Sequence, residues 1–154
     1  MLVRVDDTVL DDTSKGESPL ASEQLTYALL VQGAPYSRQA SHSALRFAEA
    51  LPGAGHRLAS VFFYHDGVFN AASMMSPPPD EPHLLERWRA LNERLGCELL
   101  VCVAAGVRRG LLDASEARRH GYPAATLVPP FELTGLGQLV SAAQRCDRLI
   151  TFAP

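Results

Sequence analysis

The sequence has few cysteines, a deficit of basic residues and no long apolar run. Its three cysteines, Cys97, Cys102 and Cys146, are odd in number and loosely spaced, which excludes a disulfide framework and favours a reducing, cytoplasmic location. Because 17 Asp and Glu residues outnumber 14 Lys and Arg residues, direct nucleic-acid binding is not expected. No apolar run reaches about 18 residues and no signal-peptide pattern opens the chain, so no membrane partner is expected.

Motifs for bound cofactors are also missing. Neither G-x-G-x-x-G nor G-x-x-x-x-G-K-[ST] occurs, which argues against nucleotide binding. The five histidines form no H-E-x-x-H motif and no paired Cys/His spacing, which argues against zinc. A G-x-S-x-G motif is absent as well, which disfavours a serine hydrolase. We therefore expect no metal and no cofactor.

The composition divides the chain into two parts. Residues 1–23 carry six acidic residues and no aromatic residue, and they hold too little apolar surface to offset the entropy lost on folding. We expect a mobile acidic N-terminal extension over residues 1–23 and one α/β domain over residues 24–154. The total length of 154 residues suits a single domain.

Within that domain, short apolar runs alternate with segments of helical periodicity. The runs are typical of strands buried on both faces. Strands are expected at residues 25–31, 56–64, 98–104 and 148–152, and helices at residues 40–51, 84–95, 114–120 and 136–143. Asp80 is expected to cap the second helix, and Asp113 with Glu116 has the spacing of a capping box. The pattern predicts an α/β fold in which helices cover both faces of a parallel sheet.

Cys102 is the residue best placed for chemistry. It lies near the carboxyl end of the third predicted strand, where parallel sheets form their sites. Arg108 and Arg109 follow within seven positions, and the N–H groups of a helix beginning nearby would add to their effect, so thiolate is favoured over thiol. A cysteine in an apolar strand is more often a small core residue, and this alternative stays open. For Cys97 and Cys146 a packing or surface role is favoured.

Several segments in this order resemble the DsrE-like family of small α/β proteins, and in particular its sulfurtransferase subunits. The most specific are V-F-F-Y followed by G-V-F-N, and C-V-A-A followed by R-R-G. All the matching segments lie at residues 33–36, 59–64, 67–70, 102–105, 108–110 and 133–137. The resemblance spans about residues 25–152.

The resemblance implies a function in sulfur relay. Cys102 would accept sulfane sulfur as a cysteine persulfide and pass it on for 2-thiolation of the wobble uridine of tRNA. The implied partners are TusB- and TusC-like paralogues in a heterohexamer, a TusA-like sulfur donor and a TusE-like acceptor. Two alternatives stay open: a DsrE-type subunit of sulfur oxidation, and a non-catalytic scaffold subunit of a paralogous complex.

The expected site is small, because persulfide transfer needs one accessible thiolate and nothing else. Arg108 and Arg109 are candidates for stabilising the thiolate or persulfide, and pairing with a surface carboxylate is an equal alternative for each. Tyr36, Tyr64 and Asn70 are candidates for shaping the pocket.

Overall fold

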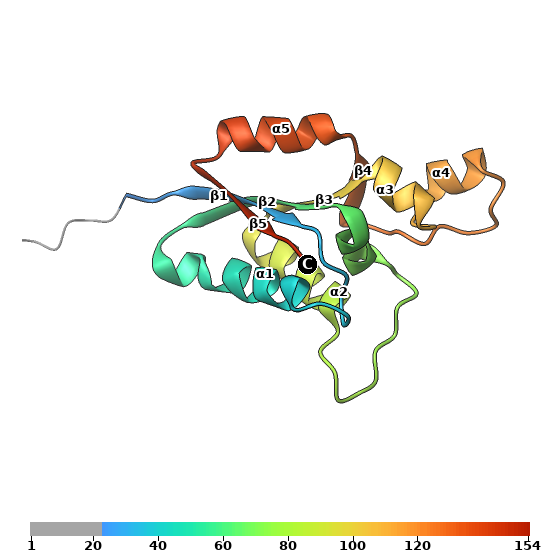
Figure 1. Cartoon of the computed structure of the whole chain (residues 1–154), viewed down its shortest axis with the longest axis horizontal. Helices are drawn as coiled ribbons and strands as arrows, with labels where there is room; N and C mark the ends of the chain where they lie inside the picture. The colour runs from blue at the N-terminus through green and yellow to red at the C-terminus, as the bar shows by residue number, and fades with distance from the viewer. Residues whose placement is uncertain (1–22) are drawn as a thin grey trace, which may run out of the picture.

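The computed structural model describes residues 23–154 (Figure 1). The expected N-terminal extension therefore lies outside the described residues, apart from Glu23. The strands are β1 Thr26–Val31, β2 Arg57–Phe63, β3 Glu98–Cys102, β4 Phe131–Thr134 and β5 Arg148–Phe152. The α-helices are α1 Gln39–Ala50, α2 Leu84–Leu95, α3 Val103–Arg108, α4 Ala114–Arg119 and α5 Leu136–Arg145, and the 3-10 helices are η1 Pro52–Ala54 and η2 His65–Ala71.

The strands form one parallel sheet in the order β4-β3-β2-β1-β5. The chain advances strand by strand from β1 to β4 and then returns across the sheet to place β5 beside β1. Crossovers between parallel strands are right-handed, so reversing the direction of travel moves the connecting helix to the opposite face. Figure 1 shows this result, with α1 and α2 on one face and α5 on the other. The predicted α/β fold with helices on both faces is confirmed.

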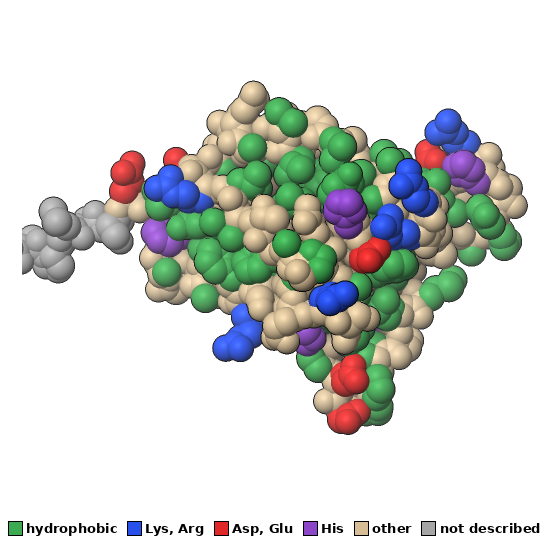
Figure 2. Space-filling view, viewed as in Figure 1, with side chains coloured by type: hydrophobic (Ala, Val, Ile, Leu, Met, Phe, Trp, Pro, Cys, Tyr) green, Lys and Arg blue, Asp and Glu red, His purple; other side chains and the backbone are tan. Residues whose placement is uncertain are grey.

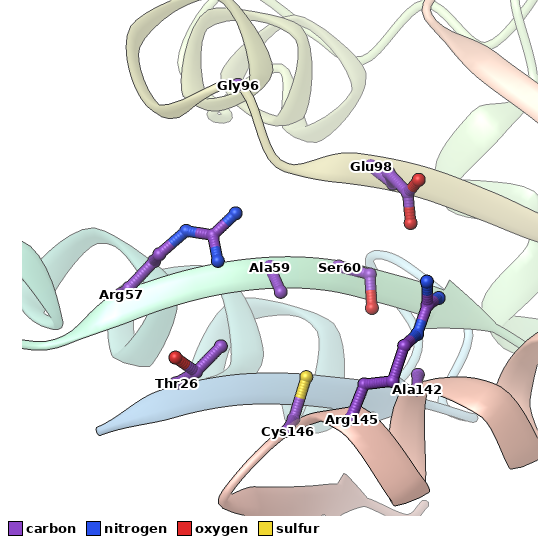
Figure 3. Close-up of a pocket in the computed structure, with 9 residues that line it drawn as sticks. All are labelled: Thr26, Arg57, Ala59, Ser60, Gly96, Glu98, Ala142, Arg145 and Cys146. Carbon is purple, nitrogen blue, oxygen red and sulfur yellow. The ribbon is translucent and has the colours of Figure 1, made fainter.

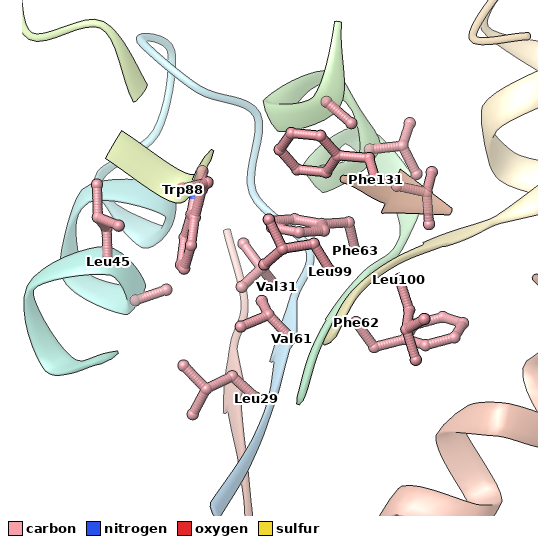
Figure 4. Packing of buried hydrophobic residues seen from close by; sticks show 14 of the residues in the cluster. Leu29, Val31, Leu45, Val61, Phe62, Phe63, Trp88, Leu99, Leu100 and Phe131 are labelled. Atoms are coloured by element: carbon pink, nitrogen blue, oxygen red, sulfur yellow. The ribbon is translucent and has the colours of Figure 1, made fainter. Parts of the chain in front are cut away.

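The main core lies between the sheet and the α1–α2 layer. Trp88 is fully buried and packs edge-on against Phe63, with ring centroids 5.3 Å apart. Phe131 lies on the other side of Phe63, with centroids 5.9 Å apart. Figure 4 shows this cluster, and it shows Phe62 and Leu100 pointing to the opposite face of the strands. Full burial of such a side chain stabilises the fold by about 1.5–3 kcal/mol.

A buried polar network crosses this core. Asn70, which is 1% exposed, donates through Nδ2 to Ser41 Oγ and to the carbonyl of Gly67, both at 2.8 Å. Its Oδ1 accepts from Trp88 Nε1 at 3.1 Å, and Ser41 donates in turn to the carbonyl of Gly33 at 2.8 Å. Because buried polar groups are costly when unpaired, these bonds hold η2 in one place against α1 and α2.

The helix boundaries test the capping predictions. Asp113 Oδ1 accepts from the backbone N–H of Glu116 at 2.8 Å, so the predicted cap of α4 is confirmed. The prediction that Asp80 caps α2 is wrong, because that helix begins at Leu84. Pro82 gives the reason: its ring disfavours helical backbone at the preceding residue and delays the start of the helix.

The strand boundaries differ from the prediction in two places that concern the site. Strand β4 was not predicted, because four residues are too few to show a clear alternation. Strand β3 was expected to run to residue 104, but it ends at Cys102, and α3 begins at once. Cys102 therefore lies at a strand-to-helix junction. Among residues 23–154, no helix has the length and apolar character needed to cross a membrane.

Candidate functional site

A pocket of about 300 Å³ opens where β2, β3 and β4 end side by side. Cys102, the last residue of β3, lies in register with Thr134 at the end of β4. The residues that follow β2, Tyr64 and His65, line one part of the pocket, and Leu136 at the start of α5 lines another. Helix α3, Arg109 just after it and Gly135 just before α5 supply the rest of the lining. Three adjacent strand ends thus surround one cysteine.

The thiol-bearing residue is recessed. Cys102 is 2% exposed and lines the pocket, which is its opening to solvent. It also occupies the N-cap position of the six-residue helix α3. The first peptide N–H groups of a helix lack partners within it and carry partial positive charge, an environment that favours an anion.

The two neighbouring arginines have different surroundings. Arg109 donates through Nε to Asp66 Oδ1 at 2.9 Å and through Nη1 to the carbonyl of Ala105 at 3.2 Å. Arg108 is exposed and lines the pocket, and within residues 23–154 its side chain makes no ion pair or hydrogen bond. Arg109 is therefore held in the structure, whereas the charge of Arg108 is available to a ligand.

The pocket as a whole has a positive rim. In the described part of the chain, the pocket is lined by two arginines and a histidine but by no carboxylate residue. Figure 2 shows basic and histidine side chains gathered around one acidic group over the region of α3, with hydrophobic side chains nearby. The electrostatic environment favours an anionic reactant.

Helix η2, which forms one wall of the pocket, packs closely against the end of β1. A Cβ on Gly67 would lie 2.1 Å from the carbonyl oxygen of Val31, so only glycine permits this approach to the end of β1. The N–H of Gly67 donates to Gln32 O at 2.9 Å. His65 adopts a φ of 49°, which is unusual for a non-glycine residue, and its ring centroid lies 4.2 Å from that of Tyr64. The surrounding contacts hold this conformation.

The sequence candidates divide into two groups. The structure brings Tyr64, Arg108 and Arg109 to the pocket of Cys102 but does not bring Tyr36 or Asn70 there. The buried network described above engages the amide of Asn70. The hydroxyl of Tyr36 joins the loop after β1 to the start of α2, accepting from the N–H of Leu84 and donating to the carbonyl of Pro82, both at 3.1 Å.

Among the lining residues that the sequence analysis did not name as candidates, two come directly after β4. Gly135 and Leu136 belong to the pocket because β4 ends beside β3. A sequence signal for them existed, because residues 133–137 are one of the segments that carry the family resemblance. The sequence analysis gave that segment no role in the site.

The other two cysteines have different environments. Cys97 is 1% exposed, and burial raises its pKa to about 11. Cys146 lies with Arg57 and Arg145 in a second pocket of about 270 Å³, at the opposite, amino ends of the strands (Figure 3). Burial raises the pKa of Cys146, although Arg145 and Arg57 act in the opposite direction. All three cysteines are free thiols, and Cys102 alone lies at the carboxyl end of the sheet.

The described residues also bear on metal binding. Within residues 23–154, no group of three or more His, Cys, Asp or Glu side chains is arranged to hold a metal ion.

Comparison with known proteins places the chain in a family. The sequence model of the DsrE/DsrF-like family matches residues 26–152. The chain belongs to the DsrE/DsrF-like family. The sulfurtransferase TusD of Salmonella newport (strain SL254) is 50% identical over 128 residues, which cover 83% of this chain and all of that protein. The sulfurtransferase TusD of Enterobacter sp. (strain 638) is 49% identical over the same share of each chain.

These relationships confirm two of the sequence predictions. The chain is a DsrE/DsrF-like protein, and it is a sulfurtransferase. The crystal structure of the ychN protein from E. coli covers 84% of this chain and all of its own, with a TM-score of 0.66 at 18% identity. That likeness concerns the fold, which is a DsrE/DsrF-like α/β fold.

Proposed function

We propose that this sulfurtransferase works in sulfur relay, with Cys102 carrying the sulfur as a persulfide. The observation that supports this most is the position of Cys102, recessed at the carboxyl end of β3 in a pocket with a positive rim. A thiolate there would be close to Arg108 and to the first N–H groups of α3. Both stabilise negative charge on sulfur.

The proposed reaction is a pair of exchanges at sulfur. The Cys102 thiolate attacks the outer sulfur of a donor persulfide, the donor's S–S bond breaks, and the donor thiolate leaves with the electron pair. The acceptor thiolate then attacks the outer sulfur now held on Cys102, which restores the Cys102 thiolate. The two steps cause no net oxidation or reduction.

The proposed destination of the sulfur is the 2-thiolation of the tRNA wobble uridine. Relatives at about 50% identity carry the name sulfurtransferase TusD, which supports this branch of the family over a DsrE-type role in sulfur oxidation. The proposed partners are TusB- and TusC-like paralogues in a heterohexamer, a TusA-like donor and a TusE-like acceptor. The cytoplasm is the proposed location, because its reducing conditions keep cysteines free.

Intact-mass spectrometry tests the loading step. The full chain, alone and co-purified with its paralogues, is incubated with a cysteine desulfurase, cysteine and the TusA-like carrier. The wild type is expected to gain one sulfur atom, which a reductant removes. Cys102→Ser is expected to gain none, and the matched variant Cys146→Ser is expected to gain one. Persulfidation of Cys102→Ser to the wild-type extent would mean that another cysteine accepts the sulfur. No persulfidation of the wild-type complex would mean that the subunit acts as a scaffold.

A further inference from the structure

We infer that the Cys102 pocket also accepts small dianionic sulfane-sulfur donors of the thiosulfate type, with Arg108 as the anion-binding residue. Such a donor would load the protein without a carrier protein. The inference rests on the proposed role of Cys102 as the sulfur acceptor, and it adds a substrate class that binds at the same site.

The first argument is access. Cys102 is 2% exposed and lies in a pocket of about 300 Å³. A broad, folded surface cannot come within bonding distance of a recessed thiol, whereas a slender group can. A five-atom anion displaces only a few water molecules, each occupying about 30 Å³ in the liquid. The pocket therefore has room for thiosulfate together with several waters.

The second argument is charge. Asp66 and the carbonyl of Ala105 already engage Arg109, at 2.9 Å and 3.2 Å. Arg108 has no such partner within residues 23–154, and it lines the same pocket as Cys102. A planar guanidinium offers two parallel N–H donors to an oxyanion, which a sulfonate group matches. No carboxylate residue of the described chain lines the pocket, and the carboxylate of Asp66, outside the lining, is paired with Arg109.

The reaction balances without an oxidant or a reductant. The Cys102 thiolate attacks the outer, sulfane sulfur of thiosulfate, the S–S bond breaks, and the electron pair leaves with sulfite. The product is the Cys102 persulfide. Cyanide, used as an artificial acceptor, then attacks the outer sulfur of that persulfide and leaves as thiocyanate, which returns the Cys102 thiolate.

Thiocyanate formation from thiosulfate and cyanide provides the test, using the full chain alone and with its paralogues. Wild type is expected to turn over and Cys102→Ser is not. Arg108→Ala is expected to raise the KM for thiosulfate by about ten- to a hundredfold, the value of a charge-assisted hydrogen bond. Arg108→Lys is expected to recover part of the loss. Arg118→Ala, which removes an exposed arginine of α4 outside this pocket, is the matched control and is expected to behave as wild type.

The outcomes separate this inference from the proposed function. If a persulfidated carrier protein loads Cys102 but thiosulfate does not, the inference is overturned and the proposed function stands. If neither donor loads Cys102, both fail. An unchanged KM in Arg108→Ala would overturn the role of Arg108 in binding the anion. Sulfur found on Cys146 would overturn the assignment of the pocket.

Discussion

Nε of Arg109 lies 2.9 Å from Oδ1 of Asp66, and this ion pair ties η2 to the end of α3. The two elements meet beside Cys102, because one follows β2 and the other follows β3. The second hydrogen bond of Arg109, to the carbonyl of Ala105, fixes the guanidinium on α3. The pair thus sets the relation between the wall that carries His65 and the helix that begins after the proposed acceptor.

Breaking this ion pair is expected to affect sulfur loading more than stability. The side chain of Asp66 is 59% exposed, so Asp66→Asn should lower the free energy of unfolding by only about 0.2–1 kcal/mol. The rate at which Cys102 gains sulfur should fall severalfold, because η2 is no longer tied to α3. Urea denaturation and time-resolved mass spectrometry measure the two effects. Glu86→Gln removes a similarly exposed partner, that of Arg89, and should leave loading unchanged. Equal loading rates in both variants would show that the pair has no part in shaping the pocket.

The buried network around Asn70 predicts a large loss of stability. Asn70→Ala removes the acceptor of the Trp88 N–H and the amide that donates to Ser41. Unpaired buried groups cost about 1–3 kcal/mol each, so the free energy of unfolding should fall by about 2–5 kcal/mol in urea denaturation. Asn92→Ala removes a single side-chain bond, to the carbonyl of Cys97, and should cost about 0.5–1.5 kcal/mol. An equal fall in the free energy of unfolding in the two variants would mean that the network stabilises the fold no more than a single hydrogen bond does.

Gly67 is expected to tolerate no side chain. In Gly67→Ala the new Cβ would meet the carbonyl oxygen of Val31, so η2 must move away from β1, and the free energy of unfolding should fall by at least about 1–3 kcal/mol. Sulfur loading should slow as the wall moves. Gly53→Ala is the control, because its new Cβ would meet nothing within 4 Å, and its stability should change by no more than about 0.5 kcal/mol. A Gly67→Ala protein as stable as Gly53→Ala would contradict the close approach of Gly67 to the carbonyl of Val31.

The pKa of Cys97 predicts a pH dependence of stability. Burial raises it from 9.0 to about 11 in the folded protein. Between these values the unfolded thiol loses its proton while the folded one keeps it, so the free energy of unfolding should fall as the pH rises from 9 to 11. Below pH 9 both states are protonated and the contribution is constant. Urea denaturation across this range compares wild type with Cys97→Ala, in which this part of the slope should vanish. Identical slopes would mean that Cys97 ionises as easily folded as unfolded.

The sequence predicted the position of Cys102 well, for a physical reason. Apolar runs such as residues 98–104 mark strands buried on both faces, and the carboxyl ends of parallel strands share one edge of the sheet. The end of the strand was predicted two residues late, because Val103 and Ala104 are as apolar as the strand itself. Apolar composition alone does not separate a buried strand from the first turn of a short helix.

Which of the two arginines forms an ion pair could not be predicted from the sequence. Arg108 and Arg109 are adjacent, yet one is exposed at the pocket and the other is paired. The pairing partner, Asp66, is 43 residues away in the chain, and a contact at that separation depends on the folded topology. The same holds for Tyr36 and Asn70, which follow strand ends as the sequence indicated but direct their side chains to the start of α2 and to the core.

The most direct test of the account is a sulfur chase from Cys102. The full chain, with its paralogues, is loaded on Cys102, freed of donor, and mixed with the TusE-like acceptor, and both proteins are followed by intact-mass spectrometry. The account predicts that the chain loses one sulfur atom at the rate at which the acceptor gains one, and that Cys146→Ser does the same. An acceptor that gains sulfur as fast from a complex carrying Cys102→Ser, or a Cys102 persulfide that is never passed on, would contradict it.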